Sequence, residues 1–73
     1  MDRMAFVSNC NYLMYVIEKQ ADKQGYDIDN DEWYKYITSL IIGIENEEEA
    51  YNPSMIFMIA TELGKLLERT KIG

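Results

Sequence analysis

Apolar residues recur at intervals of three and four along most of this chain, which is the spacing of one face of an α-helix. The first such stretch predicts a helix over residues 3–24. Gly25 follows it, where a helix commonly ends because glycine adopts the left-handed conformation without a side-chain clash. The predicted core face of this helix consists of Phe6, Cys10, Leu13, Met14, Ile17 and Ala21.

The second predicted helix spans residues 30–44, and several signals agree on where it begins. Asp29 is the expected N-cap, and Glu32 three residues later completes a capping box. Ile28 and Trp33 stand before and after this cap, at the positions of a hydrophobic staple. The predicted core face consists of Trp33, Tyr36, Ile37, Leu40, Ile41 and Ile44.

The third predicted helix carries the most apolar segment of the chain, and we expect the other two helices to pack on it. Asn52 is its expected N-cap, and Pro53 takes the first helical position, where its missing N–H costs nothing. The helix should run to about Arg69. Before it, Asn46 is expected to cap a short helical turn with residues 47–49 in its first turn. The predicted core face consists of Ile56, Ile59, Ala60, Leu63, Leu66 and Leu67.

These patterns predict an all-α fold, a small three-helix bundle with a short extra helical turn before the last helix. At 73 residues the chain is one domain, residues 1–73. Cys10 is the only cysteine and there is no histidine, so neither a disulfide nor a structural zinc site can stabilise it. No apolar run approaches the roughly 20 residues needed to span a bilayer, and we expect a cytoplasmic protein.

The sequence offers little chemistry, and we expect a protein that is not an enzyme and binds no cofactor or metal. Asp27, Asp29 and Asp31 have the alternate spacing of the first ligands of a calcium loop. The match then fails, because Glu32 replaces the required glycine and Thr38 replaces the bidentate glutamate. The buried position expected for Cys10 and the lack of a histidine also argue against a nucleophile.

Negative charge is concentrated in the middle of the chain. The formal net charge is −6, yet residues 27–49 alone carry −7, because this segment contains eight acidic residues and a single basic residue, Lys35. Direct binding to nucleic acid is therefore disfavoured. The acids either cap helices and keep a small protein in solution, or they form a surface that meets a basic partner protein.

Several large apolar residues project away from the predicted core faces, including Tyr12, Tyr15, Ile42, Phe57 and Met58. Three short helices enclose too little interior for all of them. They indicate an interface, most simply that of a two-fold homodimer, or one central helix that is apolar nearly all round.

We therefore expect a small acidic regulatory or inhibitory protein that acts by binding another protein. A more specific version is a nucleic-acid mimic that occupies the basic, nucleic-acid-binding surface of its partner. The alternative is a structural or assembly protein, a homo-oligomeric helical subunit whose acids only keep it soluble. The residues expected to bind the partner are Asp29, Asp31, Glu32, Glu47, Glu48, Glu49, Tyr12, Tyr15, Phe57 and Met58. The residue usage, rich in Ile, Tyr, Asn, Glu and Lys, is typical of AT-rich genomes, such as those of many viruses.

Overall fold

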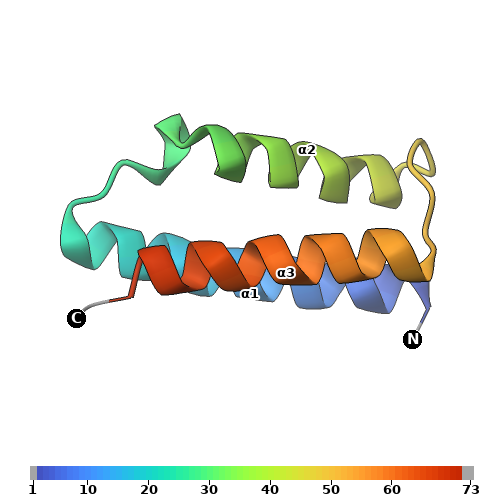
Figure 1. Cartoon of the computed structure of the whole chain (residues 1–73), viewed down its shortest axis with the longest axis horizontal. Helices are drawn as coiled ribbons and strands as arrows, with labels where there is room; N and C mark the ends of the chain where they lie inside the picture. The colour runs from blue at the N-terminus through green and yellow to red at the C-terminus, as the bar shows by residue number, and fades with distance from the viewer. Residues whose placement is uncertain (1, 72–73) are drawn as a thin grey trace.

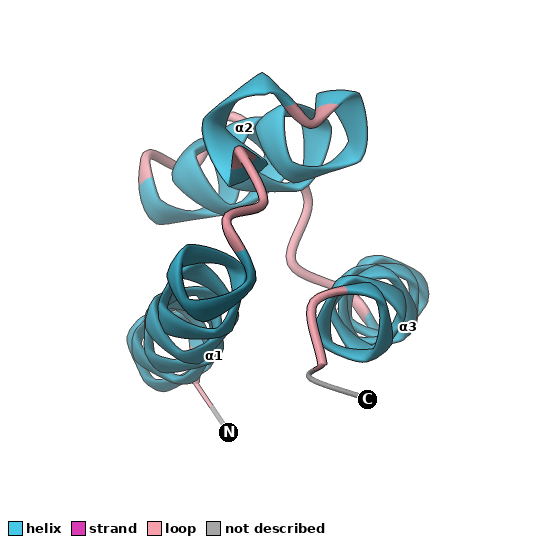
Figure 2. Ribbon diagram, turned by 90° about the vertical axis from the view of Figure 1, so that its left-hand side faces the viewer, coloured by secondary structure: helices cyan, strands magenta, loops and turns pink. Residues whose placement is uncertain are grey.

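A computed structural model describes residues 2–71. It contains three α-helices, α1 (Arg3–Gln24), α2 (Glu32–Glu45) and α3 (Pro53–Arg69), with a single 3₁₀ turn (Ile28–Asn30) before α2. The helices lie nearly along the 34 Å long axis of the molecule, with α2 antiparallel to α1 and α3 (Figure 1). Viewed along that axis, the helices form a triangle in which each contacts the other two (Figure 2). The predicted three-helix bundle is confirmed.

The apolar spacing of each helix accounts for the core, which all three helices build together. Phe6 and Val7 begin it at the N-terminal end of α1, and Ile28 of the 3₁₀ turn closes the opposite end. Ile17, Ile37 and Ile59 are fully buried at its centre, one from each helix. The buried apolar side chains of this core are Phe6, Val7, Cys10, Met14, Ile17, Ala21, Ile28, Ile37, Leu40, Ile41, Ile44, Ile59, Leu63 and Leu66.

The predicted ends of α1 and α3 are confirmed. Gly25 follows α1 with a φ of 69°, the left-handed conformation that glycine tolerates. The side chain of Asn52 accepts a hydrogen bond of 2.9 Å from the backbone N–H of Met55, and Pro53 is the first residue of α3. At the far end, the N–H of Thr70 still donates to the carbonyl of Leu66.

The predicted N-cap of α2 is wrong. Asp29 lies inside the 3₁₀ turn, and the cap is Asp31, whose side chain accepts a 3.0 Å hydrogen bond from the N–H of Tyr34. Glu32 is thus the first helical residue and cannot complete a capping box, which needs the third position. Trp33 is the second helical residue rather than the fourth, so it is not placed for a staple with Ile28.

The helical turn predicted just before α3 is absent. The single short turn among residues 2–71, a 3₁₀ turn, precedes α2 instead. Asn46 is the C-cap of α2, where its N–H donates to the carbonyl of Ile42, and it does not cap a new turn. Residues 47–50 form a tight non-helical loop in which Glu47 has a φ of 61°. The left-handed conformation of Glu47 changes the direction of the chain directly after α2, and residues 47–50 do not form a helical turn.

Some predicted core positions are exposed. Leu13 on α1 and Ala60 on α3 face solvent, and Ile56 and Leu67 are half-buried at the edge of the core. Trp33 and Tyr36 on α2 are 51% and 49% exposed. Three short helices bury a narrower face than the full apolar spacing suggests, so residues at its edges reach solvent.

Contacts between side chains and backbone fix the helices at both ends of the bundle. Arg3 donates from Nη1 to the carbonyl of Ile44 at 2.9 Å, which joins the start of α1 to the end of α2. Gln20 donates from Nε2 to the hydroxyl of the buried Thr70 at 3.1 Å, which joins α1 to the end of α3. None of the helices within residues 2–71 is long and apolar enough to cross a membrane.

Candidate partner-binding surface

The two groups of acidic residues predicted to bind a partner lie at opposite ends of α2. Asp29 and Glu32 stand at its N-terminal end, and residues 47–49 follow its C-terminal end (Figure 1). A helix of 14 residues is about 21 Å long, and most of its length separates the two groups. The acids therefore form two patches rather than one continuous face.

The carboxylate of Asp31, in the first group, already has hydrogen-bond partners within the protein. Besides capping α2, its carboxylate accepts hydrogen bonds from the hydroxyl of Tyr26 and from Nη2 of Arg69, the latter at 2.8 Å. Only 7% of its side chain is exposed. Burial favours the neutral acid, but the hydrogen bonds from Tyr26 and Tyr34 and the charge of Arg69 outweigh it and lower the pKa of Asp31.

Asp29 and Glu32 remain available to solvent at this end. The side chain of Glu32 is 88% exposed, and its only ion pair among the described residues is a loose 3.7 Å contact with Lys35. An exposed pair of this kind contributes little free energy, on the order of 0–1 kcal/mol. A basic group of a partner could displace it at small cost.

The second group forms a tightly turned loop. The backbone N–H groups of Glu48 and Glu49 both donate to the carbonyl of Gly43, at 2.8 and 3.0 Å. A Cβ atom at Gly43 would lie 2.6 Å from Cγ of Glu49, so glycine makes room for the loop to fold back on α2. These hydrogen bonds hold the backbone of the loop at the C-terminus of α2.

That position is electrostatically unfavourable for the isolated protein. The C-terminus of a helix carries partial negative charge, so Glu45 and residues 47–49 oppose the helix dipole and repel one another. Within residues 2–71 none of these glutamates forms a salt bridge. Arg3, which donates to the carbonyl of Ile44, is a cation at this end of α2, and a basic partner would add further positive charge there.

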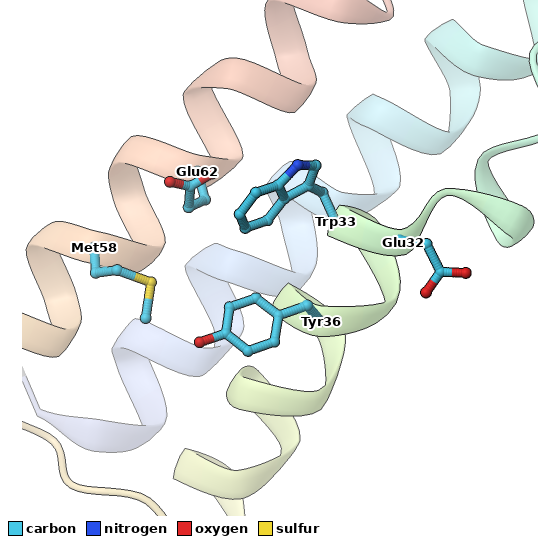
Figure 3. A pocket seen from close by; sticks show the side chains of 5 residues that line it. All are labelled: Glu32, Trp33, Tyr36, Met58 and Glu62. Atoms are coloured by element: carbon cyan, nitrogen blue, oxygen red, sulfur yellow. The ribbon is translucent and has the colours of Figure 1, made fainter.

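A groove runs between α2 and α3, and Figure 3 shows the side chains that line it. Trp33 and Tyr36 extend from α2 and meet edge to face, with ring centroids 6.0 Å apart and an angle of 72° between the planes. Met58 and Glu62 extend from α3 on the other side. The hollow between them has a volume of about 550 Å³, within the range of roughly 300–1,000 Å³ typical of ligand sites.

Glu62 is the charged side chain that enters this groove. Only 17% of the side chain is exposed, and its Oε1 atom is 3.3 Å from Nζ of Lys65, which is itself 65% exposed. Glu32 also borders the groove, but its carboxylate points away from the hollow (Figure 3). A smaller hollow of about 90 Å³ continues from Trp33 and Glu62 towards Lys65 and Arg69.

Two of the predicted partner-binding residues, Glu32 and Met58, are thus brought together at one groove. Trp33, Tyr36 and Glu62 were missed, the first two because their spacing assigned them to the core. In the structure the residues of α3 that face Trp33 include Glu62, Lys65 and Arg69, and the spacing of apolar residues does not specify this pairing. Long charged side chains keep their ends in water and leave an aromatic ring only partly covered.

The remaining predicted residues lie outside the groove. Tyr12 on α1 is 68% exposed, and Phe57 on α3 is 73% exposed. Tyr15 borders a separate hollow of about 220 Å³ between α1 and α2, and Nζ of Lys19 lies 5.4 Å from the centre of its ring. The prediction that these three residues project from the core is confirmed, but they do not join the groove.

The hollow between α1 and α2 contains a polar contact that links the two helices. The hydroxyl of Tyr34 on α2 donates to the carboxylate of Glu18 on α1. Burial and this hydrogen bond both raise the pKa of Tyr34, so the phenol stays protonated. The pair links α1 to α2.

Among residues 2–71, no group of three or more cysteine, aspartate and glutamate side chains is arranged to hold a metal ion. Burial raises the pKa of the Cys10 thiol to about 11, which disfavours the reactive thiolate. No protein-family model matches the chain, and neither the curated proteins nor the solved structures contain a significant match to it.

Proposed function

We propose that this chain is a small non-enzymatic regulatory or inhibitory protein that acts by binding a basic partner protein. The observation that carries the proposal is the loop of residues 47–49, which keeps three exposed glutamates at the negative end of α2 without an ion pair among the described residues. Charge held at a cost to stability is typical of a binding surface.

In the more specific version of this proposal, the protein occupies the nucleic-acid-binding surface of its partner. The two acidic patches lie at the two ends of α2, which is about 21 Å long, in a molecule that extends 34 Å along its longest axis. One turn of duplex DNA is about 34 Å long, so a surface that contacts phosphates up to one turn apart could contact both patches. This spacing supports a mimic of separate phosphate contacts rather than of a continuous strand.

The test is affinity capture from cells that express the protein, at low and at moderate salt, followed by elution with duplex DNA. Basic nucleic-acid-binding proteins should be retained at low salt and released by DNA. A Glu47→Gln/Glu48→Gln variant should retain several-fold less, because charge at a binding surface mainly governs the rate of association. An Asp22→Asn/Glu68→Gln variant removes the same charge elsewhere on the surface and should retain the same proteins as the wild type.

Retention that does not change with salt or with the substitutions at residues 47 and 48 would contradict charge-based binding. If salt releases the retained proteins but DNA does not, the proposal of a basic partner is kept and the proposal of a nucleic-acid mimic is rejected.

Exposed apolar side chains favour the second candidate, a homo-oligomeric structural or assembly subunit. Phe57, Tyr12 and Tyr15 are each more than half exposed on the outer sides of α3 and α1. Aromatic residues are enriched where subunits meet. Sedimentation over a range of concentrations separates the candidates. The structural role is favoured if the protein is an obligate oligomer, if Phe57→Ser dissociates it, and if it retains no basic protein.

A further inference from the structure

Glu62 sets the chemistry of the groove between α2 and α3. Its side chain is 17% exposed and lies beside Trp33 in the groove, and its ion-pair partner, Lys65, extends mostly into solvent. A purely apolar side chain that filled this groove would remove the remaining water from the carboxylate. Removing water from a carboxylate is unfavourable when its one ion-pair partner is a largely exposed lysine at 3.3 Å, so an apolar occupant is disfavoured. An acidic occupant would be repelled.

We propose that this groove binds an arginine side chain of the basic partner, with its guanidinium paired to Glu62 and stacked against Trp33 or Tyr36. This inference rests on the proposed function, because it names the group by which the partner is recognised.

Arginine fits the groove better than lysine for two reasons. Its planar guanidinium donates two parallel hydrogen bonds to one carboxylate, so it can replace the single 3.3 Å contact of Lys65. It also stacks on aromatic faces, and two ring faces at 72° to each other line the hollow. The sulfur and methyl group of Met58 lie opposite Tyr36 and can contact the aliphatic part of the same side chain (Figure 3).

The other cations near the groove do not occupy this position. Arg69 is held by Asp31 at 2.8 Å, at the end of the groove farther from Met58. Lys65 is 65% exposed and can turn into solvent when a stronger partner arrives. The negative net charge of −6 also favours the approach of a cation.

The test uses Trp33, the only tryptophan in the chain, as a fluorescent reporter in the groove. The unmodified protein is titrated with a short alanine-based helical peptide that carries one arginine and, four positions away, one leucine. A second peptide replaces the arginine with citrulline, which has nearly the same shape but no charge. The arginine peptide should change the fluorescence in a saturable way, and the citrulline peptide should bind at least about tenfold more weakly.

Two variants locate the binding site. Glu62→Gln keeps the shape of the side chain and should lower the affinity for the arginine peptide by about tenfold. Glu68→Gln, on the exposed side of the same helix, removes the same charge and should leave the affinity unchanged. Equal binding of the two peptides by the unmodified protein, or no saturable change with the arginine peptide, would overturn the inference.

This outcome is independent of the test of the proposed function. If the arginine peptide does not bind but a basic partner is captured normally, the arginine site in the groove is rejected. The proposed charge-based role of residues 47–49 is then kept. Binding of the arginine peptide without capture of any basic protein would reject the proposed function and keep the groove as an arginine site.

Discussion

Arg69 donates a hydrogen bond of 2.8 Å from Nη2 to Oδ2 of Asp31, and so joins the last turn of α3 to the residue that caps α2. The other carboxylate oxygen of Asp31 accepts from the N–H of Tyr34. One side chain thus fixes both the start of α2 and its position against α3.

Replacement of Asp31 by alanine should destabilise the protein by about 1–2 kcal/mol, because it removes an N-cap and a contact between two helices. Asp29→Ala is the matched control: Asp29 is exposed inside the 3₁₀ turn and caps no helix, so its loss should change stability by less than about 0.5 kcal/mol. Urea unfolding followed by Trp33 fluorescence measures both variants. A larger effect at Asp29 would reject the cap assignment.

The stabilisation by Asp31 should disappear in acid. Since its pKa is lowered in the folded protein, the ionised form favours folding. That contribution is fully present above the unfolded pKa of about 3.9 and is lost as the pH falls through the lower folded value. The difference in unfolding free energy between the wild type and Asp31→Asn should therefore narrow below about pH 4. A difference that stays constant to pH 2 would contradict the lowered pKa.

Two glycines in helices should respond in opposite ways to alanine. Gly64→Ala should stabilise the protein by about 0.5–1 kcal/mol, because alanine favours the helix and, apart from the neighbouring helix backbone, no atom lies within 4 Å of the new Cβ. Gly43→Ala should destabilise it, because the new Cβ would lie 2.6 Å from Cγ of Glu49. In a Glu49→Ala background most of this penalty should vanish, which thermal unfolding of the four variants would reveal. Stabilisation by Gly43→Ala alone would mean that the loop is easily displaced.

Cys10 should resist thiol reagents while the protein is folded. The side chain is buried, and burial raises the pKa of its thiol to about 11, so very little thiolate exists at pH 8. Reaction with a disulfide reagent should be slow in buffer and fast in denaturant. Rapid reaction without denaturant would indicate frequent opening of α1.

Local signals in the sequence were sufficient for the bounds of α1 and α3. Gly25, Asn52 and Pro53 each act on their own backbone, and no distant contact overrides them. The start of α2 could not be predicted in this way, because Asp29 and Asp31 are equally good caps in isolation. Asp31 differs from Asp29 because it accepts hydrogen bonds from Tyr26 and Arg69. Arg69 lies 38 positions further along the chain, so the residues around the cap do not reveal this contact.

The candidate site was predictable only in part, for a similar reason. The exposure of Phe57 and Tyr12 follows from their place on each helix. The groove depends on which residues of α3 stand opposite Trp33, and helical spacing does not specify packing partners. The loop after α2 depends on the left-handed Glu47, a conformation that is uncommon for glutamate.

The parallel course of α1 and α3 separates the two ends of the described chain (Figure 1). Arg3 contacts the last turn of α2 beside the glutamate loop, whereas Arg69 lies at the end of the groove. A purification tag or surface linker fused at the N-terminal end would crowd the first region, and one fused at the C-terminal end would crowd the second. Immobilised assays therefore need both orientations, since either attachment alone would shield one of the two proposed contacts.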